Sequence, residues 1–146
     1  MSLFAVIVLT SAALFAGAAS YISMVEHPAR LLLDDEPLLA QWQPSYARAL
    51  PIQSGLAILG GVCGLAAWYV SGGWLWIAGS AALLANWPFT LMAIMPTNKR
   101  LQAARPAQAG PDTRALLLSW GRLHDLRSLL GLISTLLFAM AMMATA

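Results

Sequence analysis

The stretch WGRLHDLR, which lies just before a long apolar run, combines an aromatic ring, an imidazole and a guanidinium group. In a helix, the spacing i, i+4 and i+7 places Trp120, His124 and Arg127 on one face, whereas Arg122 and Asp125 point away from it. Histidine can act as a base near neutral pH, arginine can hold an oxyanion, and tryptophan can stack on a flat ring. The pattern indicates either a site on this face or an ordinary charged helix end at a membrane surface.

Other polar residues lie within or beside apolar runs, where they often mark function in a membrane protein. The motif EHPAR, directly after the first apolar run, contributes an acidic residue and a histidine. The motif NWPFT, inside a later apolar run, contributes an asparagine, a tryptophan and a threonine, and the motif MPTNKR at the end of that run contributes a second asparagine. The asparagine of NWPFT equally suits a hydrogen bond to a neighbouring helix or to a carbonyl freed by Pro88. These further candidates are Glu26, His27, Asn86, Trp87, Thr90 and Asn98.

The two histidines, His27 and His124, are expected at similar depth on the same side of a membrane, which suggests a metal or haem site as one interpretation. A metal site usually needs three or four ligands, however, and Cys63 is the only cysteine. Neither an HExxH motif nor a CxxCH motif is present. The sequence therefore predicts no metal and no cofactor, and a haem or copper redox protein using the two histidines stays an alternative.

The composition is that of an integral membrane protein. The chain has 146 residues, of which 60% are hydrophobic and 10% are charged, and its mean hydropathy is +0.71. A soluble domain carries about 25% charged residues, so too little polar surface is available here to cover a soluble globule. The net charge of +2 is too small to suggest binding to nucleic acid. No positively charged region precedes the first apolar run, which argues against a cleaved signal peptide.

Four stretches are long enough to cross about 30 Å of hydrocarbon as helices. They predict one all-α transmembrane domain over residues 1–146, an integral membrane four-helix bundle. The short SGG turn between two of them predicts an antiparallel hairpin. Pro28 is expected to lead the chain out of the first helix, and Pro96 is expected to end or bend the third. The predicted spans are residues 3–25, 51–71, 74–95 and 128–146, and the predicted charged loops are residues 26–50 and 96–127, the latter with a solvated connector at 99–114.

The charges are one-sided. All eight Lys and Arg residues fall in the two charged loops, which lie on the same side of a four-span protein. The positive-inside rule then places both loops in the cytoplasm and both termini outside the inner or plasma membrane. Four glycines of the second span, Gly55, Gly60, Gly61 and Gly64, are expected to let another helix approach closely. Such faces also suit a homodimer.

An ordered set of motifs resembles the anthrone-oxygenase-like family of small membrane proteins, formerly known as a domain of unknown function. The motifs are EHPAR, W-x-P-S-Y at 42–46, NWPFT at 86–90, MPTNK at 95–99 and W-x-x-x-H-x-x-R at 120–127, and they cover nearly the whole chain. The resemblance implies a four-helix membrane protein. It also implies a monooxygenase that oxidises an anthrone to an anthraquinone with O₂, without a metal or organic cofactor.

That chemistry requires a base, a group that stabilises an oxyanion, and a flat apolar slot. His124 is expected to be the base, with Arg127 and Asn98 on the substrate oxygen and Trp120 against the ring. His27 is the alternative base, tuned by Glu26. The other residues expected to line the slot are Trp42, Tyr46, Asn86, Trp87 and Thr90. The expected partners are a hydrophobic aromatic molecule, O₂ and membrane lipid.

Two alternatives to an oxygenase stay open at this stage. The same pocket could bind a small apolar ligand or lipid without chemistry. The histidine pair could instead carry haem or copper. The sequence names neither the substrate nor the oligomeric state, and it leaves the choice between His27 and His124 as the base undecided.

Overall fold

The fold is an all-α bundle of four long helices, as predicted. A computed structural model describes residues 3–144, and no β-strand occurs within that range. Residues 145 and 146 of the predicted fourth span lie outside the described part of the chain. The first long helix comprises α1 (Leu3–Tyr21), the π-turn η1 (Ile22–Glu26) and α2 (His27–Arg30), and the second is α3 (Asp35–Ser71). The third comprises α4 (Trp74–Leu84), α5 (Asn86–Phe89), the π-turn η2 (Thr90–Ile94) and α6 (Met95–Ala103), and the fourth is α7 (Pro111–Ala144).

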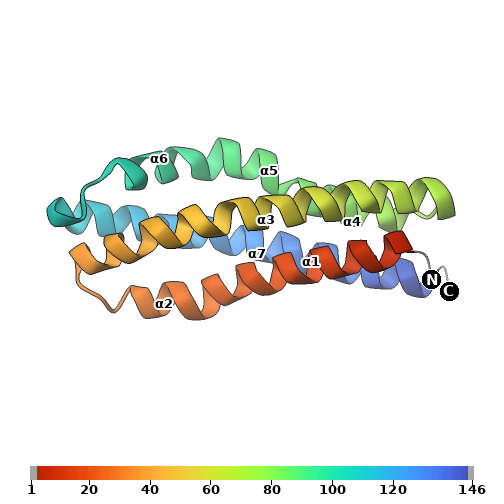
Figure 1. The fold of residues 1–146 in the computed structure, drawn as a ribbon, viewed down its shortest axis with the longest axis horizontal. Coiled ribbons are helices and arrows are strands. Elements are labelled where there is room, and N and C mark those ends of the chain that lie inside the picture. Colours follow the sequence, from red (N-terminus) through yellow and green to blue (C-terminus); the bar gives the residue numbers. More distant parts are fainter. Residues whose placement is uncertain (1–2, 145–146) are drawn as a thin grey trace.

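Each long helix packs against two neighbours. The α1 helix contacts α3 and α7, and α4 contacts the same two helices, so α1 and α4 occupy opposite corners of the bundle. Figure 1 shows the start of α1 and the end of α7 at one end, and the connections from α2 to α3 and from α6 to α7 at the other. Gly72 and Gly73 have positive φ values of 73° and 89° in the tight turn between α3 and α4. The predicted antiparallel hairpin is therefore confirmed.

The segments expected to be charged loops are largely helical. The first long helix continues through Pro28 to Arg30, the third continues through Pro96 to Ala103, and α3 begins at Asp35. Only residues 104–110 connect α6 to α7, with a short 3₁₀ turn, η3 (Pro106–Gln108), inside them. The expected solvated connector at 99–114 is therefore wrong at both of its ends.

A π-turn just before each proline explains why the two helices do not stop. The N–H of His27 bonds to the carbonyl of Ile22, and the N–H of Met95 bonds to the carbonyl of Thr90, each five residues back. A proline ring clashes with the carbonyl four residues before it in a regular helix. The wider turn accommodates the ring, and π-turns of this kind are frequent at functional sites.

Arg114 fastens the end of the bundle that is remote from the termini. Its guanidinium donates to Asp35 at 2.5 Å and to the carbonyls of Leu31 and Leu33 at 3.0 and 2.6 Å. These three bonds connect α7 to the short segment between α2 and α3. A charged side chain near the bundle end thus has a structural role in holding two helices together.

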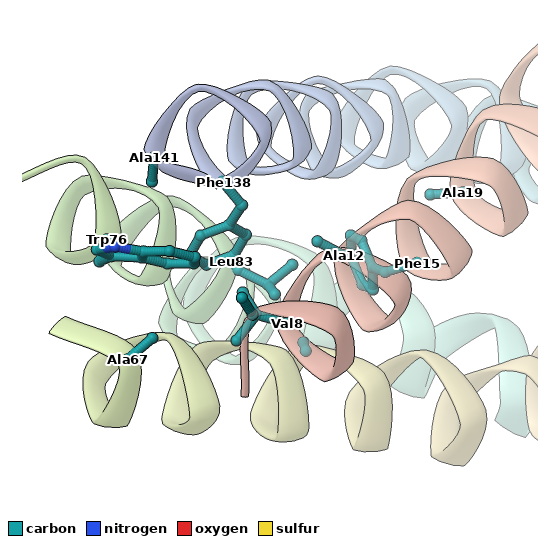
Figure 2. Packing of buried hydrophobic residues seen from close by; sticks show 11 residues of the cluster. Val8, Ala12, Phe15, Ala19, Ala67, Trp76, Leu83, Phe138 and Ala141 are labelled. Carbon is teal, nitrogen blue, oxygen red and sulfur yellow. The ribbon is translucent and has the colours of Figure 1, made fainter. Parts of the chain in front are cut away.

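The interior consists of two apolar clusters with a polar layer between them. One cluster lies near the termini and includes Leu83, Trp76 and Phe138 (Figure 2). The ring centroids of Trp76 and Phe138 are 5.9 Å apart. The other lies near the connections and includes Trp42 and Trp120. Along the second, third and fourth long helices, buried polar residues fall between the residues that belong to one cluster and those that belong to the other. The main members of this polar layer are Gln53, Asn86, Thr90, His124, Arg127 and Ser128.

All four long helices are long and apolar enough to cross a membrane. Many large apolar side chains on their outer faces are exposed, among them Leu14, Ile58, Met92 and Leu132. A bundle with a polar layer inside and apolar residues outside has the arrangement expected of a protein surrounded by lipid.

Three of the four glycines predicted to allow close helix packing do so. A Cβ atom at Gly60 would lie 2.7 Å from a side chain of α4, and one at Gly61 or Gly64 would also clash with α4. At Gly64 the new atom would in addition come within 2.9 Å of the ring of Phe138. The prediction is wrong for Gly55, which has no such neighbour within 4 Å.

We expect Gly64→Ala to lower the free energy of unfolding by about 1–3 kcal/mol, because the added methyl group overpacks the contact between α3, α4 and α7. Gly55→Ala is the matched control on the same helix, and it should leave stability unchanged or raise it slightly. Thermal unfolding of both variants in the same detergent measures the difference. Equal stability of the two variants would contradict the close packing of α3 on α4.

Candidate functional site

Two cavities adjoin the polar layer and share Arg127 as a wall. The larger, of about 130 Å³, lies between α3, the α5–η2 segment and α7. The smaller, of about 20 Å³, lies between α1–α2, α3 and α7. The larger cavity is lined by Leu50, Ser54, Ala57, Asn86, Trp87, Thr90, Leu91, Met95 and Arg127. The smaller is lined by Ile22, Arg30, Trp42, Ser45, Tyr46, Ala49, Leu50, Gln53, Trp120, His124 and Arg127.

Arg127 is a buried cation without a carboxylate partner. Its residue is 6% exposed, and it takes part in none of the ion pairs formed within residues 3–144. Its Nε atom is buried without a hydrogen-bond partner in that range. The guanidinium carbon lies 5.7 Å from the centre of the Phe15 ring, on one face of it. Because a buried charge without a counterion is costly, this position is suited to receive an anion or an oxyanion.

Two serine hydroxyls lie beside His124. Ser23 Oγ is 3.1 Å from Nδ1 of His124 and 2.9 Å from Ser128 Oγ. Ser128 donates to the carbonyl of His124 at 3.3 Å, as helical serines commonly do. This chain of contacts is compatible with a proton on Nδ1 that is donated to Ser23, which leaves the lone pair on Nε2 of a ring that lines the smaller cavity.

Three aromatic rings form a continuous wall beside His124. Trp120 stacks on His124 at a centroid distance of 4.9 Å and meets Trp42 edge to face at 5.5 Å. Trp42 in turn stacks on Tyr46, one helical turn away on α3, at 4.9 Å and with an interplanar angle of 7°. This confirms that Trp120, His124 and Arg127 share the buried face of α7, whereas Arg122 is exposed.

Asn98 reaches the site only through Tyr46. Its side-chain amide donates to the Tyr46 hydroxyl at 2.8 Å, and its own oxygen is buried without a partner in the described chain. The asparagine lines neither of the two cavities, whereas Tyr46 lines the smaller one. The structure thus places Asn98 behind the tyrosine, which differs from its expected position on the substrate oxygen.

His27 lies outside both cavities. Its ring meets Trp120 at 5.1 Å, and a Cβ atom at Gly121 would lie 2.6 Å from its Nε2, so the imidazole packs tightly against α7. Neither ring nitrogen has a well-aligned hydrogen bond within the described residues, although the backbone of Leu117 is close enough to interact. His124, by contrast, lines the smaller of these two cavities.

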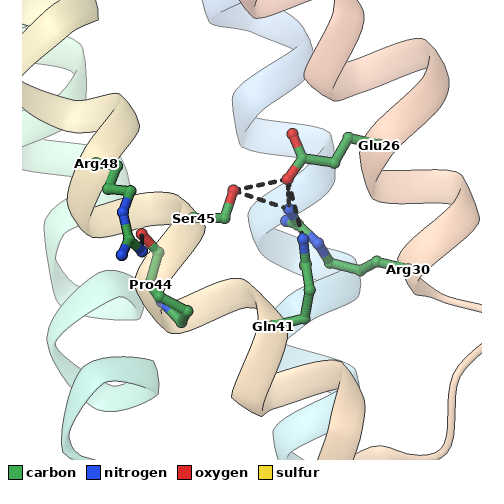
Figure 3. Close-up of polar contacts among 6 residues, drawn as sticks. All are labelled: Glu26, Arg30, Gln41, Pro44, Ser45 and Arg48. Carbon is green, nitrogen blue, oxygen red and sulfur yellow. Dashed lines mark hydrogen bonds and ion pairs between the residues drawn. The ribbon is translucent and has the colours of Figure 1, made fainter.

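Glu26 is directed at a buried arginine. It forms an ion pair with Arg30, and the same carboxylate oxygen accepts from Ser45 at 2.6 Å and from Gln41 at 3.3 Å (Figure 3). Arg30 also donates to Ser45 at 3.2 Å and lines the smaller cavity. The expected partnership between Glu26 and His27 is replaced by this network, which joins α2 to α3.

Three polar residues of the site were not singled out from the sequence. Arg30 could have been found from its i, i+4 spacing to Glu26, which is typical of a helical ion pair. Gln53 is a lone polar residue inside the predicted second span, which is itself a signal. Ser23 carries no such signal, because its importance arises from contact with α7.

Three residues of the NWPFT motif, Asn86, Trp87 and Thr90, line the larger cavity. The Asn86 amide donates to the carbonyl of Leu83 at 3.1 Å, where the helix is interrupted, and so it also has the structural role considered for it. The Asn86 oxygen and the Thr90 hydroxyl are buried without partners in the described part of the chain. Trp87 is 39% exposed and lies at the outer edge of the cavity. An apolar slot with a few unsatisfied polar atoms is a typical small-molecule site.

Together, the fold and the site define a class: a helical bundle with apolar outer faces that encloses a guanidinium and an imidazole at two adjoining cavities. Sequence comparison gives the family within this class. The profile of the anthrone oxygenase family matches residues 42–137. The anthrone oxygenase dmxR16 of Cryptosporiopsis sp. (strain 8999) is 31% identical over 141 residues, which cover 90% of this chain and 81% of that protein. The chain belongs to the anthrone oxygenase family, and no solved structure matches it.

We expect the purified protein to contain no stoichiometric transition metal or haem. Within residues 3–144, no three side chains of His, Cys, Asp or Glu are grouped so that they could hold a metal ion. Elemental analysis and an absorption spectrum of protein prepared without chelator test this expectation. About one copper, iron or zinc per chain, lost in His27→Ala or His124→Ala, would contradict it.

Proposed function

We propose that this protein is a membrane-embedded, cofactor-independent oxygenase that oxidises an anthrone-like or other hydrophobic aromatic substrate with O₂. The observation that carries the proposal is the buried Arg127 guanidinium, which pairs with no carboxylate of residues 3–144 and borders both the apolar cavity and the smaller cavity that His124 lines. Membership of the anthrone oxygenase family supports oxygenase activity. The substrate itself is part of the proposal.

The larger cavity is the proposed site for the aromatic substrate. Its wall is mostly apolar, and Trp87 offers a ring for stacking at its outer edge. The unpaired oxygens of Asn86 and Thr90 can accept or exchange hydrogen bonds with substituents on the substrate. The substrate oxygen would then face Arg127 at the inner end, where the planar guanidinium can donate two parallel hydrogen bonds.

The proposed chemistry begins with removal of a proton. The carbon between the two aryl rings of an anthrone is acidic because its carbanion is conjugated to the ketone. His124 lines the adjoining smaller cavity and not the larger one, so in this proposal the acidic carbon of the substrate lies beside Arg127, where the two cavities meet, and His124 accepts its proton on Nε2. Arg127 stabilises the enolate oxygen that results, by donors already in place before the charge develops. The electron-rich enolate then reacts directly with O₂.

The overall reaction is balanced without an added reductant. O₂ adds to the deprotonated carbon to give a peroxide, which is protonated to a hydroperoxide. Loss of the remaining hydrogen on that carbon, with cleavage of the O–O bond, gives the second carbonyl and one water. An anthrone and O₂ thus yield an anthraquinone and water. His124, protonated in the first step, gives that proton to the peroxide; it then removes the remaining C–H hydrogen as a proton and passes it to the leaving oxygen, which departs as water.

The surrounding residues have positioning roles in this proposal. Asn98 orients the Tyr46 hydroxyl, and Tyr46 stacks on Trp42. Trp120 packs on the His124 ring and restricts its rotation. His27, the alternative base, lies outside both cavities and supports Trp120 from the far side of the site. We therefore assign the base to His124.

We also propose that the long helices cross the inner or plasma membrane with both termini outside and the charged end of the bundle in the cytoplasm. All eight Lys and Arg residues lie in residues 26–50 and 96–127, and the structure brings these segments to one half of the bundle. A hydrophobic substrate and O₂ both partition into lipid, so a site between the helices is accessible to both.

The topology predicts that a reporter fused to the C-terminus is active only if the reporter works outside the cytoplasm. Alkaline phosphatase and green fluorescent protein fusions in a bacterial host give opposite signals and therefore control for each other. A fluorescent, phosphatase-inactive C-terminus would contradict the orientation, and it would place the charged half of the bundle on the opposite side of the membrane.

We expect His124→Ala to lower the rate of anthrone oxidation by roughly 10²–10⁴-fold with the fold intact, because a positioned base is lost. Arg127→Lys should also lower the rate, since a point charge cannot reproduce the planar fork. Arg122→Ala is the matched control, because Arg122 lies on the exposed face of the same helix and should change little. The measurement is O₂ consumption together with quinone absorbance.

Two results of this experiment would contradict the proposal. If Arg122→Ala is as damaging as His124→Ala, the buried face of α7 has no special role. If the wild-type protein binds anthrones but consumes no O₂, the chain is a ligand-binding member of its family without chemistry.

A further inference from the structure

Several residues that line the smaller cavity carry a buried nitrogen donor for which residues 3–144 supply no acceptor. Four residues that line it each bury an N–H group without a hydrogen-bond partner in the described chain. Each of these residues is at most 6% exposed, so water outside the bundle does not satisfy the groups. Buried polar groups without partners are rare in folded proteins. The four atoms are Arg30 Nε, Trp42 Nε1, Gln53 Nε2 and Arg127 Nε.

The charge of this cavity is positive. Arg30 and Arg127 both line it, and only Arg30 has a carboxylate partner, Glu26. The Tyr46 hydroxyl accepts from Asn98, so its own proton is available to donate into the same space. A cavity with two guanidinium groups, one carboxylate and several free donors favours a small anion that only accepts hydrogen bonds.

The size of the cavity limits what can occupy it. The cavity has a volume of about 20 Å³. One water molecule needs a cavity of about 10–15 Å³, so the space holds slightly more than one water but is far too small for an aromatic ring system. A water molecule has two lone pairs and two protons, so it cannot satisfy four or more donors without leaving its own protons unpaired. A diatomic oxygen anion has lone pairs on both atoms and no proton, and it matches the donor set better.

We infer that the smaller cavity is a separate site for O₂, in which the superoxide or peroxide formed from it is stabilised while the aromatic substrate occupies the larger cavity. The inference rests on the proposed function and deepens it. The enolate gives one electron to O₂, which leaves a substrate radical and superoxide. The two then combine to form the carbon–oxygen bond of the peroxide, so that no electron or proton is left over.

Gln53 is the residue that distinguishes this inference best. It lines the smaller cavity but not the larger one, it carries no charge, and its free amide is a donor. Gln53→Leu keeps the approximate volume and removes a buried group without a partner, which is neutral or stabilising for the fold. Thr90→Val is the matched control, because Thr90 lines only the larger cavity.

The experiment measures kcat/KM separately for O₂ and for the anthrone. We expect Gln53→Leu to lower kcat/KM for O₂ by roughly 10- to 100-fold, because the loss of one hydrogen bond to a charged group has an effect of about this size. The KM for the anthrone should stay unchanged. Thr90→Val should raise the KM for the anthrone and leave kcat/KM for O₂ unchanged. If Gln53→Leu changes only the KM for the anthrone, or changes neither parameter, the inference is wrong.

A second measurement separates this inference from the proposed function. If the wild-type protein oxidises no anthrone, the proposed function fails, and anion binding is then tested directly. Thermal unfolding is followed with sodium chloride against sodium gluconate, whose anion is far too large for the cavity. A chloride-dependent rise in unfolding temperature in the wild type that is absent in Gln53→Leu supports the small-anion site. The same response in both proteins, or in neither, overturns it.

Discussion

One buried guanidinium without a counterion is the constraint around which this bundle is organised. Arg127 lies in the polar layer between two apolar clusters, and no carboxylate in the described chain pairs with it. Transfer of an unpaired charge into an apolar interior is costly. The structure offsets this cost only in part, with the face of Phe15 and two adjoining cavities. In the proposed reaction, the remaining cost is offset when the enolate or an O₂-derived anion binds beside Arg127.

Two prolines at predicted helix ends, Pro28 and Pro96, lie inside long helices and help to position the polar layer. Each of the two π-turns before Pro28 and Pro96 inserts an extra residue into a helical turn. Such a turn rotates the residues that follow relative to those before it. Thr90 and Asn98 are eight residues apart and would point about 80° apart in a regular helix, whereas the extra residue of the second π-turn brings them onto one face, and both are buried. The same prolines therefore lengthen the bundle beyond the apolar spans and aim its polar side chains inward.

Periodicity within one helix could be predicted from the sequence, and contacts between helices could not. The face formed by Trp120, His124 and Arg127 follows from spacing alone, because α7 is regular through this region. The fold class follows from four apolar runs and a short glycine turn. The position of Asn98 behind Tyr46, however, depends on a 2.8 Å contact between residues 52 positions apart. The proposed role of Gln53 depends on its position at the same cavity as Arg127. The sequence around Gln53 does not indicate that position.

The division of the site by Arg127 fits a reaction in which negative charge moves between two molecules. In the proposed reaction the enolate carries the charge first, and the O₂-derived anion carries it after electron transfer. Because Arg127 borders both cavities, the charge passes from one side of the guanidinium to the other and stays near the same cation. Donors fixed before the reaction need little rearrangement as the charge moves. A bundle that holds one cation rigidly between an apolar slot and a donor-lined pocket can therefore promote direct reaction with O₂ through its own side chains.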